Sequence, residues 1–298
     1  MSWTKIIGQE RVKRLLQNML LAKQLAHAYL FYGAEGIGKD ALALEFARTI
    51  NCSSGAPNPC GWCPSCKKFE TLQHPDVKLI FPLPVGKGEK QGDDPFSVLT
   101  EDQILTVREQ VRLKAEDPYH KIEIPKANFI KINSIRSMKR ESSMSRSEEG
   151  KKIFIIFNAE LMNMESSNSL LKTLEEPLPD TMILLTTSAK DSLLPTILSR
   201  CQTVQCDLLS EEDIFKALKE RDGIENDQSR LAARLANGSY GLARRLTSDD
   251  MAGQREETVD FVRLSLSKNL LPMLQAVEEL ANTYDRTHMQ CWLEVLQI

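Results

Sequence analysis

A glycine-rich run at residues 33–39 is the first pattern that could support chemistry. It reads Gly-Ala-Glu-Gly-Ile-Gly-Lys and matches G-x-x-x-x-G-K, with Gly33, Gly36, Gly38 and Lys39 as its candidate phosphate-binding residues. In such a loop, backbone N–H groups surround phosphate oxygens and the lysine adds a positive charge. A short apolar run precedes the motif and an Ala/Leu-rich stretch follows it, as a strand and a helix should. The pattern favours a phosphate-loop scaffold over a chance glycine-rich turn.

Two groups that would hold Mg²⁺ on a bound nucleotide are missing. The residue after the lysine should be Ser or Thr, whose hydroxyl coordinates the metal, but it is Asp40. An acidic pair should end a buried strand, yet the apolar run 153–157 ends in Phe157-Asn158, with Glu160 two residues further. We therefore expect weak or absent ATP binding and no intrinsic ATPase activity. The alternative is an active ATPase in which Asp40 or Glu160 serves as an unconventional metal ligand.

Four of the seven cysteines lie close together in the sequence and indicate a metal site. Their spacing is Cys-x7-Cys-x2-Cys-x2-Cys, and ligands two residues apart can both face one tetrahedral ion. Four thiolates leave no position for water, so the site would be structural. We predict structural Zn²⁺ at Cys52, Cys60, Cys63 and Cys66. An iron–sulfur cluster and free thiols are the alternatives.

The pattern of apolar residues predicts the elements that would position these groups. Strands are predicted at 28–32, 77–81, 153–157, 182–187 and 203–206, and helices at 9–25, 39–49, 100–115, 166–176 and 193–200. Residues 130–140 read as a short strand followed by the start of a basic helix. Strands that alternate with helices predict an α/β fold with a parallel sheet.

The character of the sequence changes near residue 208 and divides the chain. Ser210-Glu-Glu-Asp213 is a helix-capping pattern, and nothing after it reads as a strand. We predict an α/β domain at 1–207 with a cysteine module at 52–66 and an insert at 82–128. A helical region follows from 208.

Composition and charge limit the functional classes. With 42% hydrophobic and 27% charged residues the chain reads as a soluble globular protein, and its net charge of −3 excludes a global positive field for nucleic acid. A zinc-dependent DNA-binding module is a further hypothesis, although Glu70 beside Lys67 and Lys68 argues against it. No stretch approaches the about 20 apolar residues of a spanning helix, and the N-terminus resembles no signal peptide. We expect a cytoplasmic location and no membrane contact.

Several motifs together resemble bacterial clamp-loader subunits of the AAA+ class. They are Ile7-Gly-Gln-Glu, His27-Ala-Tyr-Leu-Phe, the phosphate loop, Asn168-Ser-Leu-Leu-Lys-Thr-Leu-Glu-Glu-Pro and Leu194-Pro-Thr-Ile-Leu-Ser-Arg-Cys. In that family the ATPase subunits, gamma and tau, keep Thr after the lysine and an Asp-Glu pair at the strand end. This chain departs at both places and so resembles the delta-prime type. The resemblance implies a AAA+ P-loop domain, a helical lid at 208–250 and the start of a collar at 251–298, reduced or truncated.

The resemblance also implies a function and partners. Delta-prime-like subunits help the DNA polymerase III holoenzyme to load its sliding clamp onto primed DNA, together with gamma/tau ATPase subunits and delta. Ser199-Arg200-Cys201 matches a family motif whose arginine enters the neighbouring subunit's ATP site, so Arg200 is implied as an arginine finger. An ordinary surface arginine is the alternative reading of Arg200, and an ATP-hydrolysing subunit of the gamma/tau type is the alternative function. Clamp-loader AAA+ domains also carry a four-cysteine zinc module, which supports the predicted metal.

Sensor positions can be transferred from the same family. Thr186 or Thr187 falls where the first sensor residue stands, with a structural threonine at a strand end as the alternative. Gly241 falls where active relatives carry a sensor arginine. Arg244 and Arg245 follow one helical turn later; we favour a solvated helical face for them, and substitution for the sensor arginine is the alternative.

Overall fold

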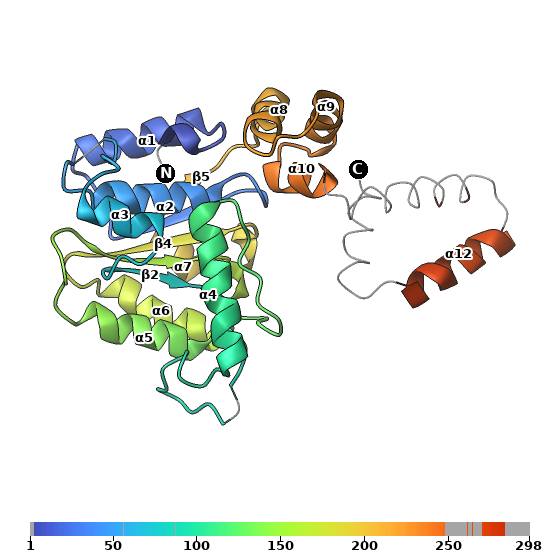
Figure 1. The fold of residues 1–298 in the computed structure, drawn as a ribbon. Coiled ribbons are helices and arrows are strands. Elements are labelled where there is room, and N and C mark those ends of the chain that lie inside the picture. Colours follow the sequence, from blue (N-terminus) through green and yellow to red (C-terminus); the bar gives the residue numbers. More distant parts are fainter. Residues whose placement is uncertain are drawn as a thin grey trace. The chain divides into compact units, whose positions relative to one another are not determined.

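The computed structural model describes residues 3–55, 57–86, 88–247, 261, 264 and 270–283 of the chain (Figure 1). The chain divides into two compact units, Met1–Leu208 and Leu209–Ile298. All named strands of the described residues lie in the first unit, and the named elements of the second unit are helices. No helix in these ranges combines the length and the apolar character needed to cross a membrane.

The first unit is built on a five-stranded parallel sheet in the order β2-β3-β4-β1-β5. Every residue of the two central strands β3 and β4 is buried, which explains their uninterrupted apolar runs. The predicted α/β fold with a parallel sheet is confirmed. The strands are β1 (Ala28–Tyr32), β2 (Val77–Ile80), β3 (Lys152–Ile156), β4 (Thr181–Thr187) and β5 (Gln202–Gln205).

Helices pack on both faces of this sheet (Figure 1). Side chains alternate along each strand, so Phe31 joins a core cluster with α1 and α2, whereas Leu30 joins one with α5 and α6. The helices of this unit are α1 (Glu10–Leu21), α2 (Lys39–Ile50), α3 (Pro64–Glu70), α4 (Glu101–Glu116), α5 (Ile132–Ser142), α6 (Met164–Glu175) and α7 (Pro195–Leu198). Short 3₁₀ turns occupy Trp3–Lys5, Ala159–Leu161 and Lys190–Ser192.

The structure corrects three details of the predicted elements. Ile130 makes only an isolated bridge to Met162, so the strand predicted there is wrong. The first helix ends at Leu21 rather than near 25, because Lys23 has a φ of 54° in the left-handed region that terminates helices. The helix predicted at 193–200 is only four residues long, because the chain must turn before β5 begins at Gln202.

The second unit is helical in its described residues. Helices α8 (Glu211–Glu220), α9 (Asn226–Leu235) and α10 (Tyr240–Thr247) pack together, and α12 spans Leu270–Thr283. The predicted cap at the start of α8 is present, since the Ser210 hydroxyl accepts a hydrogen bond from the Asp213 N–H at 3.1 Å. The predicted lid–collar boundary at 250 and most of 251–298 lie outside the described residues, so this division stays a prediction.

Candidate functional site

The phosphate loop joins β1 to α2, the context that the motif requires. Gly33, Gly36 and Gly38 have φ values of 149°, 75° and 99°, which residues that carry a Cβ atom rarely adopt. Lys39 begins α2 directly after them. The structure therefore brings the four predicted phosphate-loop residues into one turn.

The Lys39 side chain is bonded to its own loop. Its Nζ donates to the carbonyl oxygens of Gly33 at 3.0 Å and Ala34 at 2.6 Å. The side chain is buried, and desolvation lowers the pKa of the Lys39 ammonium despite nearby carboxylates that favour its charge. The charge that a nucleotide phosphate would meet is thus partly neutralised by backbone dipoles.

Asp40 stands where a metal-binding hydroxyl is expected, and both of its oxygens are engaged. Oδ2 accepts a hydrogen bond from the Lys114 ammonium at 2.7 Å, and Oδ1 accepts one from the Thr186 hydroxyl at 2.7 Å. Lys114 lies on α4 within the insert, and Thr186 lies near the end of β4. The predicted sensor threonine is therefore part of this network, whereas the Thr187 hydroxyl accepts from the Ala189 N–H at 3.1 Å.

The end of β3 offers no acidic pair to this network. Phe157 and Asn158 follow the strand, and Asn158 has a φ of 53° in the left-handed region. Glu160 Oε1 accepts a hydrogen bond from the Ser188 N–H at 3.1 Å, and Oε2 is buried without a hydrogen-bond partner. The position that should supply a hydroxyl to a nucleotide-bound Mg²⁺ therefore holds an aspartate that is paired with an ammonium.

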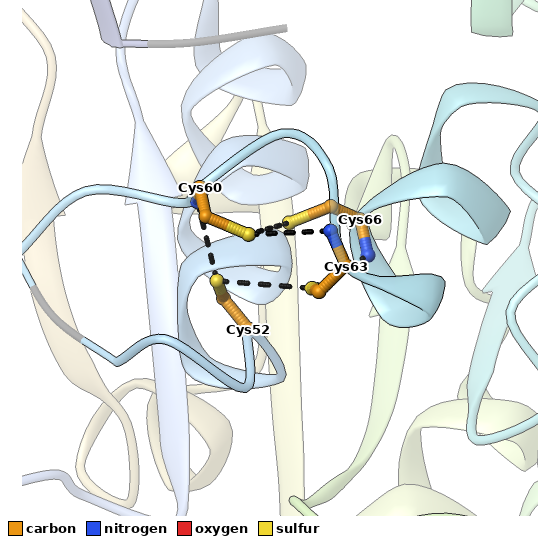
Figure 2. Close-up of side chains that lie close together, drawn as sticks. All are labelled: Cys52, Cys60, Cys63 and Cys66. Atoms are coloured by element: carbon orange, nitrogen blue, oxygen red, sulfur yellow. Dashed lines mark hydrogen bonds between the residues drawn. The ribbon is translucent and has the colours of Figure 1, made fainter.

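The four predicted metal ligands converge on one point (Figure 2). All four Sγ atoms lie within 4.8 Å of one another, and Cys52–Cys63 and Cys60–Cys66 are 4.0 Å apart. Zn–S bonds of about 2.3 Å in a tetrahedron require S···S separations of about 3.8 Å. The cysteines are free rather than disulfide-bonded, and they could hold one four-coordinate ion.

Backbone N–H groups surround the sulfurs and favour their thiolate forms. The N–H groups of Cys60, Cys63 and Cys66 point at the sulfurs of Cys52, Cys60 and Cys63 at 3.2–3.4 Å. Burial opposes ionisation, but hydrogen bonds from Ser53 and from backbone N–H groups lower the pKa of Cys63 to about 6. Burial raises the pKa of Cys66 to about 12, so a bound cation would be needed to ionise that thiol.

Arg200, the predicted finger, lies between α7 and β5 and is held by its own chain. Its Nη2 is 2.8 Å from Glu175 Oε1 at the end of α6, and its Nη1 donates to the Thr196 carbonyl at 2.9 Å. The side chain is 34% exposed. The predicted lid arginine Arg244 lies on α10 of the second unit, 3.6 Å from Asp222.

Comparison with known proteins places the chain in a family. Residues 8–209 match the family model described as DNA polymerase III, delta subunit. The chain belongs to this family. It is 32% identical to the DNA polymerase III subunit delta' of Bacillus subtilis over 84% of this chain and 63% of the relative.

Two further relatives agree with this delta-subunit family. The chain is 31% identical to the DNA polymerase III subunit delta' of Pseudomonas aeruginosa, over 83% of this chain and 63% of the relative. It is 28% identical to the DNA polymerase III subunit tau of Escherichia coli, over 84% of this chain and 33% of the relative. The predicted resemblance to bacterial DNA polymerase III delta-prime subunits, related to gamma and tau, is confirmed. The chain spans about 63% of the length of the delta' relatives that it matches.

Two residues that contribute to these sites were not predicted from the sequence. Lys114 gave no signal, because it lies 74 residues from its partner Asp40 in a helix with mostly polar residues. Arg48 is buried against the cysteine module, with its guanidinium 3.7 Å from Glu70 and 3.9 Å from Glu45, and it hydrogen-bonds Cys66. Its position four residues before Cys52 on an Ala/Leu-rich helix is the one signal that could have pointed to it.

A zinc ion at the four cysteines can be tested by metal content. Purified protein should carry one zinc per chain, and Cys66→Ser should lose most of it and unfold at a temperature about 20 °C or more lower, because structural zinc contributes about 10–16 kcal/mol in small zinc-binding peptides. Elemental analysis and thermal unfolding followed by circular dichroism measure both effects. Cys201→Ser, a buried cysteine outside the cluster, is the matched control and should keep its zinc. Zinc-free wild-type protein would contradict the assignment.

Proposed function

We propose that this chain is a non-hydrolysing, delta-prime-like subunit of a clamp loader in the DNA polymerase III holoenzyme. In this role it helps to load the sliding clamp onto primed DNA. The observation that carries the proposal is the Asp40 network, because it removes the metal-binding hydroxyl from a phosphate loop whose fold is otherwise intact. The relatives named subunit delta' support membership of the same complex.

Arg200 is the residue by which such a subunit would contribute to catalysis. A guanidinium stabilises the negative charge that spreads over the γ-phosphate oxygens in the transition state, and it needs no nucleotide of its own chain. Arg200 is partly exposed and its ion pair with Glu175 lies at the surface, where exchange for a phosphate of a neighbouring subunit costs little. The proposed partners are gamma/tau ATPase subunits and delta, with clamp and DNA bound by the assembly.

The cysteine module has a structural role in this proposal. Four thiolates around zinc would join the end of α2 to α3 and fix the chain between them. The two lysines beside the cluster are paired with carboxylates, Lys67 with Glu70 at 3.2 Å and Lys68 with Glu148. Because these carboxylates balance the charge of the two lysines, they provide no net positive charge for phosphates, which favours a structural site over a DNA-binding module.

Calorimetric titration separates this function from the gamma/tau type of ATPase. The match to the tau subunit and the retained Lys39 favour that second candidate. We expect no measurable heat of binding when Mg²⁺ and ATP are titrated to 1 mM, a limit of about −4 kcal/mol in binding free energy. Submicromolar binding together with turnover by the isolated chain would establish the ATPase instead.

Substitution of Arg200 tests its action on a neighbouring subunit. Arg200→Ala should lower DNA-stimulated ATP turnover of the reconstituted loader, with a loss of about 10³-fold or more at the single ATP site that the arginine serves. Arg200→Lys should restore little, because an ammonium lacks the planar fork of donors. Steady-state phosphate release measures the effect.

The matched control for this experiment is Arg146→Ala. Arg146 is a similarly exposed arginine, 42% accessible, that also pairs with one carboxylate, Asp180 at 3.4 Å. Its removal should leave turnover unchanged, and both variants should keep the wild-type unfolding temperature to within about 2 °C, because exposed ion pairs contribute little to stability. Wild-type turnover by Arg200→Ala in an assembled loader would refute the finger assignment.

A further inference from the structure

We propose that Asp40, which stands at the metal-ligand position directly after the phosphate loop, binds an internal ligand, the Lys114 ammonium, which the insert delivers in place of a metal ion. The insert thereby packs against the phosphate loop and keeps nucleotide out of it. This inference deepens the proposed non-hydrolysing function and assigns a role to the 82–128 insert.

The Lys114 side chain is buried, and its ammonium is engaged in two hydrogen bonds and a cation–π contact. It is 1% exposed, donates to Asp40 Oδ2 and to the His120 carbonyl oxygen at 2.7 Å each, and lies 5.0 Å from the centre of the Phe157 ring. An ammonium is a compact cation with three donors, and removing it from water costs several kcal/mol unless it is paired. The carboxylate of Asp40 supplies that pairing.

Lys39 and Thr186, two polar side chains at the loop, are engaged within the chain. Lys39 is bonded to the loop carbonyls, and Thr186 donates to the second oxygen of Asp40. The hydroxyl of Thr186 also accepts a hydrogen bond from the Asn158 N–H at 3.4 Å, which ties the end of β3 into the same network. Asp40, which alone would weaken phosphate binding by its charge, is therefore the group that the insert requires.

The segment after α4 extends the same contact across the loop. A Cβ built on Gly38 would lie 2.9 Å from the Tyr119 hydroxyl, which accepts a hydrogen bond from the Ile7 N–H at 2.8 Å. Lys121 pairs with Glu35 of the loop at 2.7 Å. The 33–39 turn is thus contacted by the insert at its glycine end and at its middle.

Apolar contacts hold the insert to the same face of the sheet. Val107 of α4 and Ile124 are buried in the core cluster that contains α2. Ile104, Val111 and Ile122 pack against that cluster from the partly buried side. Hydrophobic burial therefore favours the contact between the insert and α2, and the pair of Lys114 with Asp40 fixes how the two are aligned and balances their charges.

A double-mutant cycle in the full chain tests the coupling. Asp40→Asn, Lys114→Met and the double variant are compared by hydrogen–deuterium exchange of the amides in residues 101–124. Each single change should accelerate exchange there at least tenfold, with Asp40→Asn the more damaging because it leaves an ammonium buried without its carboxylate. The double variant should exchange no faster than Asp40→Asn alone. If the acceleration of exchange in the double variant equals the product of the two single accelerations, the two residues are not coupled and the proposal is overturned.

Two companion variants keep this cycle interpretable. Arg112→Met removes an exposed arginine of the same helix that pairs with Glu109 and Glu116, and it should leave exchange in 101–124 within twofold of wild type. Lys114→Gln replaces Lys114→Met in the cycle if the methionine variant does not fold, and the same coupling is expected. If Arg112→Met accelerates amide exchange as much as Lys114→Met does, the effect reflects a general loss of helix stability, and a specific pairing of Lys114 with Asp40 is refuted.

Nucleotide supplies the second readout. Addition of 5 mM Mg²⁺–ATP to the wild-type chain should change exchange in 101–124 by less than twofold, because the Lys114 ammonium already pairs with Asp40 and the insert contacts the loop. Slower or faster exchange beyond that limit would show that nucleotide reaches the loop and would overturn the proposal. These measurements use the isolated chain, so their failure is distinguishable from failure of the Arg200 experiment, which requires the assembled loader.

Discussion

Parallel pairing of β1 with β4 and β5 is the constraint on which the rest of this structure depends. In a parallel sheet all strands end at one edge, so residues far apart in sequence meet there. The loop after β1, Asn158 after β3 and Thr186 near the end of β4 share that edge for this reason. The same geometry gives active phosphate-loop ATPases their metal and phosphate ligands. Here it gathers a different set of groups, and their charges decide what the edge can bind.

Two charged side chains at this edge are engaged by groups of the same chain. The loop lysine turns back onto backbone oxygens, and the aspartate that replaces a hydroxyl is matched by an ammonium from α4. A buried ion pair stabilises little by comparison with apolar packing, but loss of one member is costly because the other charge stays buried. Such a pair fixes which segment lies on the loop more than it raises overall stability. The edge is therefore specified by its own chain, which agrees with the proposed non-hydrolysing role.

Features with a local cause were predictable from the sequence, and those that depend on distant partners were not. The phosphate loop, the buried strands and the cysteine module follow from spacing within a few residues. Lys114 gains its role from a carboxylate that folding brings near, so its neighbours in sequence carry no sign of it, whereas Arg48 had only its closeness to Cys52 in the sequence as a signal. Ile130 was read as a strand because it is apolar, yet it finds only Met162 to pair with. Arg200 was placed by family resemblance, and its ion pair with Glu175 became visible only in three dimensions.

Helix α2 is anchored at both of its ends. At its start, Asp40 is bound to α4 and β4; at its end, Asn51 exchanges two hydrogen bonds of 2.8 and 2.9 Å with the backbone of Lys151, and Cys52 enters the cysteine module. Its 12 residues span about 18 Å. A helix anchored in this way behaves mechanically as a strut: it resists tilting and sliding, and strain introduced at either end is carried to the other.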